Sequence, residues 1–448
     1  MPSRSLHVAV IGAGAAGLVA ARELRREGHD PVVFERGAGV GGNWLYHPAA
    51  SADPLGAGGV QSSLYASLRT NVPRECMGFM DFPFVAGAGA MSSYSDDPRR
   101  FPGHEEVLRY LQEFARRFDL LGLIRLQTEV VSVRRDDASA GWKLSYRSWR
   151  KLPGAGGEEL EEEVFDAVVV CNGHSDEPRL ADIAGIDGWP GMQMHSRNYR
   201  VPDPFNGQVV VIVGYAPSGL DISRDIVGVA KEVHVAHRSP ATSETQSTAH
   251  ANMWLHPTIE RTEEDGSVVF QDGSRVKADA ILHCTGYKYN FPFLGDDVGI
   301  LVDDNRVHPL YKHVFPPHLA PHISFIGLSL KALQFPVFQL QSNWVARVLS
   351  ERAKLPSQEE MMEDMTAFYS KLEARGCPKR YTHDLGECTY EYEDWVADQC
   401  GLERIERWRK EMFVAALKNF ADRPESYRNE WDDDHLLLEA HRDFTKYF

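Results

Sequence analysis

Two stretches of the chain share one pattern, in which a short, largely apolar run stops at a glycine-rich loop and a helical pattern follows. The first run covers residues 6–11 and leads into Gly12-Ala13-Gly14-Ala15-Ala16-Gly17. The second covers residues 209–213 and leads into Gly214-Tyr215-Ala216-Pro217-Ser218-Gly219. Short apolar runs are typical of parallel strands buried on both faces. The pattern predicts an α/β fold class with two Rossmann-like dinucleotide-binding domains.

The first loop has the spacing of a dinucleotide site. Gly12 permits a tight turn, Gly14 lets the backbone approach a pyrophosphate, and Gly17 lets the helix pack close to the strand. The pyrophosphate is expected at the helix N-terminus, where unpaired N–H groups point at it. The next apolar run ends at Glu35, roughly 20 residues further on, where a carboxylate binds ribose hydroxyls. A carboxylate repels a 2′-phosphate, so this site suits FAD or NAD; a purely structural glycine turn is the alternative.

A second glycine segment follows, Gly39-Val40-Gly41-Gly42-Asn43-Trp44. Paired glycines before an aromatic residue indicate backbone that passes close to a flat ligand, which favours FAD over NAD. An ordinary glycine turn with a packing tryptophan is the other interpretation. The residues that we assign to the FAD site are Gly12, Ala13, Gly14, Ala15, Ala16, Gly17, Glu35, Arg36, Gly42, Trp44 and Val131.

The second loop differs from the first in its ribose position. The apolar run 232–236 is followed by His237-Arg238-Ser239 instead of an acid. A guanidinium there matches a 2′-phosphate, so we expect NADPH, unless Arg238 is a solvated surface side chain. The residues that we assign to the NADP site are Gly214, Tyr215, Ala216, Pro217, Ser218, Gly219, Arg238 and Ser239. Two sites of opposite ribose preference in one chain predict electron transfer between two cofactors.

Composition narrows the class of function. The 48 basic and 64 acidic residues give a net charge of −16, which argues against nucleic acid and anionic membranes as partners. No apolar run approaches the roughly 20 residues of a transmembrane helix, so we expect a cytoplasmic protein. The six cysteines form no CxxC pair and no metal-ligand spacing, which argues against a disulfide reductase and against a metal site. Reduced, buried thiols are expected instead.

A stretch between the two loops carries a family resemblance. Trp189, Gly191, His195 and Tyr199 match the pattern aromatic-x-Gly-x-x-x-His-x-x-x-aromatic, and the chain resembles the flavin-containing monooxygenases, in which this linker motif connects the two domains. Trp189 stands where phenylalanine is usual. Baeyer–Villiger relatives carry tryptophan at the position of Tyr199, so the motif indicates oxygenation of a heteroatom instead of a ketone. A hydrogen-bonded structural role for His195 agrees with the motif at least as well as a catalytic one.

Other segments extend the resemblance along the chain. Residues 67–74 resemble the family segment in which an asparagine faces the flavin and the nicotinamide, and Asn71 takes that catalytic position here. Residues 171–174 and 283–287 resemble the strand ends where the chain crosses between domains, and residues 324–328 resemble the return to the FAD domain. The residue sequence in detail is most similar to that of plant members that oxygenate sulfur in glucosinolates or S-alk(en)yl-cysteines.

The order of these motifs implies an NADP domain inserted into an FAD domain. We expect the first part of the FAD domain at residues 1–185 and the NADP domain at 186–311. The second part of the FAD domain and a C-terminal helical region are expected at 312–448.

The resemblance implies a reaction as well. NADPH reduces FAD, O2 adds to give a C4a-hydroperoxyflavin, and a small-molecule thioether becomes a sulfoxide. The implied substrates belong to plant sulfur metabolism, either S-alk(en)yl-cysteines such as S-allyl-cysteine or methylthioalkyl glucosinolates. Three alternatives stay open: N-oxygenation of an amine, an uncoupled NADPH oxidase or flavoprotein reductase, and a dinucleotide sensor without turnover. The oligomeric state is not predicted.

Overall fold

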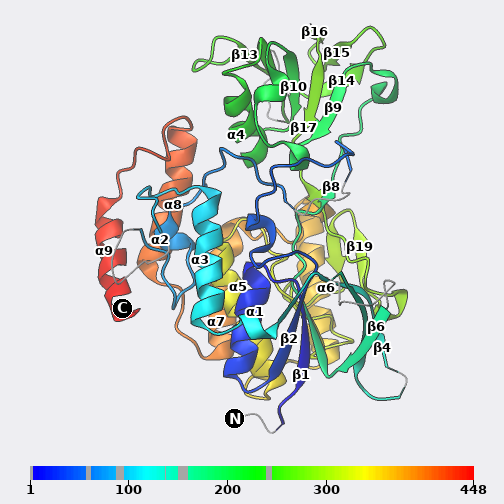
Figure 1. The fold of residues 1–448 in the computed structure, drawn as a ribbon, viewed down its shortest axis with the longest axis vertical. Helices are drawn as coiled ribbons and strands as arrows, with labels where there is room; N and C mark the ends of the chain where they lie inside the picture. The colour runs from blue at the N-terminus through cyan, green and yellow to red at the C-terminus, as the bar shows by residue number, and fades with distance from the viewer. Residues whose placement is uncertain are drawn as a thin grey trace. The chain divides into compact units, whose positions relative to one another are not determined.

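The computed structural model describes residues 4–56, 62–86, 95–136, 138–149, 160–238 and 245–447 (Figure 1). The chain forms two compact units. Unit 1 consists of Met1–Leu45, Val72–His174 and Tyr289–Phe448, and unit 2 of Tyr46–Asn71 and Ser175–Lys288. Each unit is built around its own mainly parallel sheet, so the predicted α/β class with two Rossmann-like domains is confirmed.

The central sheet of unit 1 contains the first predicted strand. Its five parallel strands run in the order β21-β7-β1-β2-β3. The apolar run at the N-terminus forms β1, which therefore lies in the middle of the sheet, where a strand is buried on both faces. The strands are β1 (His7–Ile11), β2 (Asp30–Glu35), β3 (Ile124–Leu126), β7 (Ala167–Val170) and β21 (Ile323–Phe325).

The two faces of this sheet are covered differently. Successive side chains of a strand point to opposite faces. Val8 and Val10 belong to a core shared with the helices, whereas Ala9 and Ile11 belong to a core shared with a small antiparallel sheet. The helices on the first face are α1 (Ala15–Arg26), α3 (His104–Arg117), α5 (Gln334–Leu349) and α7 (Thr389–Cys400), and α1 packs against α5. The small sheet on the second face contains β4 (Thr128–Arg135), β5 (Trp142–Ser148) and β6 (Leu160–Phe165) (Figure 1).

The C-terminal region is helical, as the sequence predicts. It contains α6 (Gln358–Ala374), which begins with a capping box between Ser357 and Glu360. Two further helices, α8 (Arg407–Asp422) and α9 (Asp434–Phe444), pack together and share an apolar core with the short helix α2 (Arg74–Met77). Unit 1 also contains the hairpin of β19 (Leu301–Asp303) and β20 (Arg306–His308).

Unit 2 repeats the same construction with a six-stranded sheet. The second predicted run forms β10, and alternate residues again face two cores: Val210 and Ile212 pack with α4 (Pro217–Ile226), whereas Val209 and Val211 pack with a small sheet. The main sheet has the order β12-β13-β11-β10-β17-β9, with β9 (Met192–His195), β10 (Val209–Val213), β11 (Glu232–Ala236), β12 (Thr245–Gln246), β13 (Met253–His256) and β17 (Ala280–His283). The small sheet consists of β14 (Ile259–Thr262), β15 (Ser267–Phe270) and β16 (Arg275–Lys277), and β8 (Glu177–Pro178) pairs with β18 (Tyr287–Lys288).

The bounds of the units differ from the ranges expected from motif order. Unit 2 begins at Ser175 and ends at Lys288, not at 186 and 311, and it also takes in Tyr46–Asn71. That segment carries no glycine loop of its own, and the order of the motifs places it within the first part of the FAD domain, so its packing onto unit 2 was not predicted.

Two expectations from composition concern the whole chain. Four cysteines are buried and none is paired in a disulfide, but Cys377 is half-buried and Cys388 is exposed, so the expectation of buried thiols holds for part of the set. Among the helices in the described part of the chain, none has both the length and the apolar character that crossing a membrane requires.

Candidate nucleotide-binding sites

The first glycine loop has a geometry that only glycine permits at two positions. Gly12 has φ +104°, and a Cβ built there would lie 2.5 Å from the carbonyl oxygen of Cys171, at the end of the neighbouring strand β7. A Cβ on Gly17 would lie 1.8 Å from the carbonyl oxygen of Gly12. These contacts confirm the tight turn and the close helix–strand packing predicted for the two glycines.

The start of α1 offers unpaired backbone donors. Gly14 is the N-cap residue and supplies no side-chain acceptor, so no cap occupies the N–H groups of the first turn. Ala15 and Ala16, which open the helix, are largely buried and present no polar side chain. This combination of free amides and small residues fits the diphosphate of a dinucleotide.

The second glycine segment lies against the first, backbone to backbone. Gly42 has φ +56°, and a Cβ there would come within 2.9 Å of the Cα atom of Gly14. The N–H of Gly41 donates to the carbonyl of Ala13 at 3.0 Å. Trp44, in the short 3-10 helix Gly42–Trp44, packs against the core of unit 1, as the interpretation of a packing tryptophan expects. The close approach of the two backbones also agrees with the other interpretation, in which this backbone passes close to a flat ligand.

Glu35 is fixed beside the first loop by two backbone donors. Its carboxylate accepts hydrogen bonds from Ala13 N at 2.8 Å and from Gly37 N at 2.6 Å. The side chain is only 7% exposed. Each carboxylate oxygen retains a second lone pair, which suits it to a ribose hydroxyl. The uncapped helix, the glycine backbone and this carboxylate together fit the adenosine diphosphate half of FAD.

The other residues assigned to the FAD site are placed as follows. Arg36 follows Glu35 and is exposed. Val131 is 37% exposed and lies at an irregularity of β4, where the register with β5 shifts between Val130 and Ser132.

The predicted return segment reaches the same loop. It follows β21, and Gly327, with φ +93°, approaches α1 so closely that a built Cβ would lie 3.6 Å from the Cβ of Ala16. The carbonyl of Gly327 also lies 3.2 Å from Nδ1 of His174. The carboxyl ends of β1, β7 and β21 therefore meet beside the start of α1, the edge at which parallel α/β sheets bind ligands.

The second glycine loop repeats the first almost atom for atom. Gly214 has φ +102°, and a Cβ there would lie 2.5 Å from the carbonyl oxygen of Cys284. A Cβ on Gly219 would lie 2.0 Å from the carbonyl oxygen of Gly214. The same two close contacts recur at equivalent places, so the two loops have the same backbone geometry at these glycines.

The second loop differs from the first in the residues at the start of its helix and at its ribose position. Ala216 is the N-cap of α4 and Pro217 its first residue, so α4 begins without a side-chain cap, as α1 does. The rings of Tyr215 and His237 lie 5.8 Å apart. Arg238 follows β11 and is exposed. Ser218 is half-buried on α4, and Ser239 lies outside the described residues. A guanidinium beside an uncapped helix fits the 2′-phosphate of NADP.

The linker motif is assembled in unit 2, and its glycine has a steric cause. A Cβ on Gly191 would lie 2.3 Å from the ring of Trp189 and 2.7 Å from the carbonyl oxygen of Asp279. Tyr199 is fully buried, and its hydroxyl donates to Asp225 on α4 at 2.5 Å. The motif therefore packs against the helix that follows the second glycine loop. A tryptophan at the position of Tyr199 could not make this bond with the same geometry.

Both ring nitrogens of His195 are engaged. Nδ1 accepts from the backbone N–H of Arg197 at 3.1 Å, so the ring proton is on Nε2, which donates to the carbonyl of Gly286 at 3.0 Å. Burial lowers the pKa of this fully buried imidazole to about 4. A neutral ring with both nitrogens in use supports the structural interpretation of His195.

Asn71 is exposed and is the last residue of its segment of unit 2. Sequence reasoning missed Arg200, which binds the backbone of the segment that precedes Asn71. The acceptors are carbonyls far away in sequence, so no residue pattern could reveal them.

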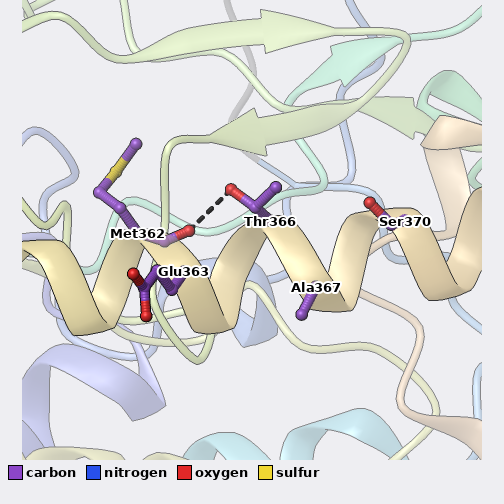
Figure 2. Close-up of a pocket in the computed structure, with 5 residues that line it drawn as sticks. All are labelled: Met362, Glu363, Thr366, Ala367 and Ser370. Carbon is purple, nitrogen blue, oxygen red and sulfur yellow. Dashed lines mark hydrogen bonds between the residues drawn. The ribbon is translucent and has the colours of Figure 1, made fainter.

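A shallow surface recess of about 480 Å³ lies on α6 (Figure 2). It is lined by Met362, Glu363, Thr366, Ala367 and Ser370, and the hydroxyl of Thr366 donates to the carbonyl of Met362 at 2.7 Å. All five residues come from one helix and none belongs to a glycine loop. The recess is thus separate from the nucleotide sites.

Comparison with known proteins shows the family to which the chain belongs. The model of the "Flavin-binding monooxygenase-like" family matches residues 5–247 and 245–397. The chain is 56% identical to flavin-containing monooxygenase FMO GS-OX-like 2 of Arabidopsis thaliana, covering 100% of this chain and 96% of that protein, and 54% identical to FMO GS-OX5 of the same plant, covering 99% and 95%.

A solved structure is similar over the same extent. The S-allyl-L-cysteine S-oxygenase of Allium sativum superposes with a TM-score of 0.92 at 53% identity, covering 99% of each chain. The expected cofactors, FAD and NADPH, agree with these matches. The chain therefore belongs to the flavin-binding monooxygenase-like family and is a flavin-dependent NADPH monooxygenase.

Proposed function

We propose that this enzyme transfers one oxygen atom of O2 to the sulfur of a small thioether, giving a sulfoxide. The observation that carries the proposal is the duplicated glycine loop with opposite ribose chemistry, Glu35 beside one copy and Arg238 beside the other. A hydride donor and a hydride acceptor of different kinds thus have separate sites in one chain.

The division of labour follows from the two loops. Unit 1 holds FAD through residues 12–17, Glu35 and Gly42, and unit 2 holds NADPH through residues 214–219 and Arg238. When bound, FAD and NADPH supply the reducing equivalents and the activation of O2. The protein binds and orients them and excludes water. Asn71 would keep the nicotinamide amide and the flavin edge in register, while His195 supports the fold of unit 2.

The choice of sulfur rests on the relatives. One is named an S-allyl-L-cysteine S-oxygenase and others carry the GS-OX designation, and their similarity covers nearly the whole chain. Tyr199, in place of tryptophan, agrees with oxygenation of a heteroatom. The proposed substrates are therefore S-alk(en)yl-cysteines or methylthioalkyl glucosinolates. A cytoplasmic location, expected from the sequence, belongs to this proposal as well.

The test is a product assay with the purified, FAD-loaded enzyme. NADPH and O2 are supplied with S-allyl-cysteine, a methylthioalkyl glucosinolate or a tertiary amine, and mass spectrometry follows products heavier by one oxygen atom. We expect sulfoxide from at least one thioether and little hydrogen peroxide. Exclusive oxidation of the amine would support the N-oxygenase alternative instead. Peroxide without any oxygenated product would support the uncoupled oxidase.

A further inference from the structure

The chain passes from unit 2 back into unit 1 at the bond between Asn71 and Val72. The proposed catalytic asparagine is therefore the last residue held by one unit before the chain enters the other. Its placement depends on how firmly the chain is fixed on each side. Both sides are fixed by a buried arginine that binds backbone carbonyls.

Arg200 fixes the side that precedes Asn71. Its guanidinium is only 5% exposed and donates to five backbone carbonyls. Three of them belong to the segment 46–71 and two to the linker: His47 (2.6 Å), Ser62 (3.0 Å), Leu64 (3.1 Å), Arg197 (2.7 Å) and Tyr199 (2.8 Å). The carbonyl of Arg200 also accepts from Ala66 N at 2.9 Å. One residue thus joins the linker motif to both ends of the segment.

The same segment is attached to α4, the helix that follows the second glycine loop. The hydroxyl of Tyr65 donates to Asp221 at 3.1 Å and that of Ser67 donates to Asp225 at 2.9 Å. Asp225 also accepts from Tyr199, whose ring packs edge-on against Tyr65. Residues 62–67 are therefore tied to the NADP-binding helix and to the linker, four residues before Asn71.

Arg409 fixes the side that follows Asn71. It is fully buried in unit 1, and Nη1 donates to the carbonyls of Glu75 (3.2 Å), Cys76 (3.3 Å) and Gly78 (2.9 Å). These residues form and follow α2, which begins three residues after Asn71. Arg409 differs from Arg200 in having a carboxylate partner, Glu406, at 2.7 Å.

We propose that Arg200 is a positioning residue for oxygen transfer, because it holds the segment that carries Asn71 on the NADP-binding unit. The proposal rests on the function proposed above. Arginine suits this task because its planar fork has five N–H donors, whereas a lysine ammonium has three. Burial lowers the pKa of Arg200, yet guanidinium stays charged across the physiological range. Its five carbonyl acceptors replace the water that burial removes.

The experiment compares Arg200→Met, Arg200→Lys and the milder Ser67→Ala with the wild-type holoenzyme. Arg261→Met, which removes an exposed arginine from β14 in the same unit, is the matched control. Three quantities are measured: FAD content, hydrogen exchange of the amides of residues 62–70 with NADP+ present, and the rate of hydrogen peroxide release with NADPH and O2 in the absence of a thioether.

We expect Arg200→Met to keep its FAD, because the FAD loop lies in unit 1. Exchange over residues 62–70 should rise about tenfold as the segment opens locally. The rate of peroxide release should rise about threefold or more as Asn71 loses its fixed position. Arg200→Lys and Ser67→Ala should lie between Arg200→Met and the wild type, and the control should match the wild type.

Two results would overturn the inference. One is unchanged exchange in all Arg200 and Ser67 variants, which would show that these residues do not hold the segment. The other is faster exchange with an unchanged rate of peroxide release, which would show that holding the segment does not matter for the reaction. These readouts need no substrate, so they are distinct from failure of the proposed function, which is a wild-type enzyme that forms no sulfoxide. If Arg200→Met does not fold, the two milder variants decide.

Discussion

At the scale of single residues, sequence reasoning succeeded where backbone geometry dictates the side chain. Gly12 and Gly17 are required because a Cβ at either would clash with a carbonyl oxygen, and the spacing of the loop shows this directly. Glu35 lies beside the loop because it ends the adjacent strand. Arg200 could not be predicted, since its partners are backbone carbonyls that every residue type has. The glycine loops and the residues that end the adjacent strands therefore leave a pattern in the sequence, whereas the contacts that hold the segment of Asn71 leave none.

Arg238→Ala tests the ribose preference of the second site. Loss of a charge-assisted contact to the 2′-phosphate should cost about 2 kcal/mol, which corresponds to a roughly 30-fold higher KM for NADPH. The KM for NADH should change little, because NADH has no 2′-phosphate. Steady-state NADPH and NADH oxidation measure both values. The exposed Arg275→Ala in the same unit serves as control, and an equal loss with both nucleotides would refute the assignment.

Asn71→Ala tests the proposed catalytic position. The variant should bind FAD normally, because the FAD loop is remote in sequence and lies in unit 1. Without the amide that holds the two rings in register, sulfoxide per NADPH should fall and peroxide should rise, by about tenfold in their ratio. Both products are quantified in one reaction. Tightly coupled turnover in this variant would remove Asn71 from the mechanism.

At the scale of elements, the strands and helices next to the motifs were predicted well because their periodicity is strong. The run 209–213 coincides with β10, and the run 232–236 with β11. What the sequence did not reveal are contacts between elements distant in sequence, such as α1 against α5 or α8 against α2. Those depend on which apolar faces meet, and many pairings satisfy the same pattern.

Helix–strand packing at the first loop gives a pair of contrasting variants. In Gly17→Ala the new methyl would meet the Gly12 carbonyl oxygen at 1.8 Å, so α1 must move away from β1. The free energy of unfolding should fall by at least about 2 kcal/mol. In Gly14→Ala the nearest atom is 3.6 Å away, so stability should be retained while FAD content falls. Denaturant unfolding and flavin absorbance separate the two effects; equal stability of both variants would contradict this packing.

A buried carboxyl on α7 makes the stability of the folded protein fall as the pH rises from 4.5 to about 8. Glu393 is fully buried, and within the described residues neither carboxylate oxygen has a hydrogen-bond partner. Burial raises its pKa from the ordinary value of 4.5 to about 8, against the opposing charge of Lys410. Its neutral form stabilises the folded state fully below pH 4.5. That contribution is lost between pH 4.5 and about 8, by about 1.4 kcal/mol per pH unit.

Glu393→Gln should remove this dependence, because the amide stays neutral. The gain in thermal unfolding midpoint over the wild type should therefore grow as the pH rises from 5 to 8. The exposed Glu391→Gln on the same helix should show no such trend. A gain that is constant with pH would mean that Glu393 is already ionised in the folded protein.

At the scale of the whole molecule, the order of motifs predicted two nucleotide-binding domains with one inserted into the other. The two Rossmann-like domains are confirmed, and the assignment of one nucleotide to each domain stays a prediction. The residues at which each unit begins and ends could not be predicted from the order of the motifs. Tyr46–Asn71 joins unit 2 through side-chain bonds to Asp221 and Asp225 and through Arg200, none of which a linear motif encodes. This arrangement places the proposed catalytic asparagine where the chain changes units.

The central claim is that NADPH bound by one unit reduces the flavin bound by the other. It is tested most directly by mixing the purified yellow protein with NADPH in the absence of O2 and following the flavin absorbance. We predict rapid, complete loss of the oxidised flavin spectrum with NADPH and a much slower loss with the same concentration of NADH. A protein that binds no flavin, or a flavin that stays oxidised under NADPH, would contradict the account.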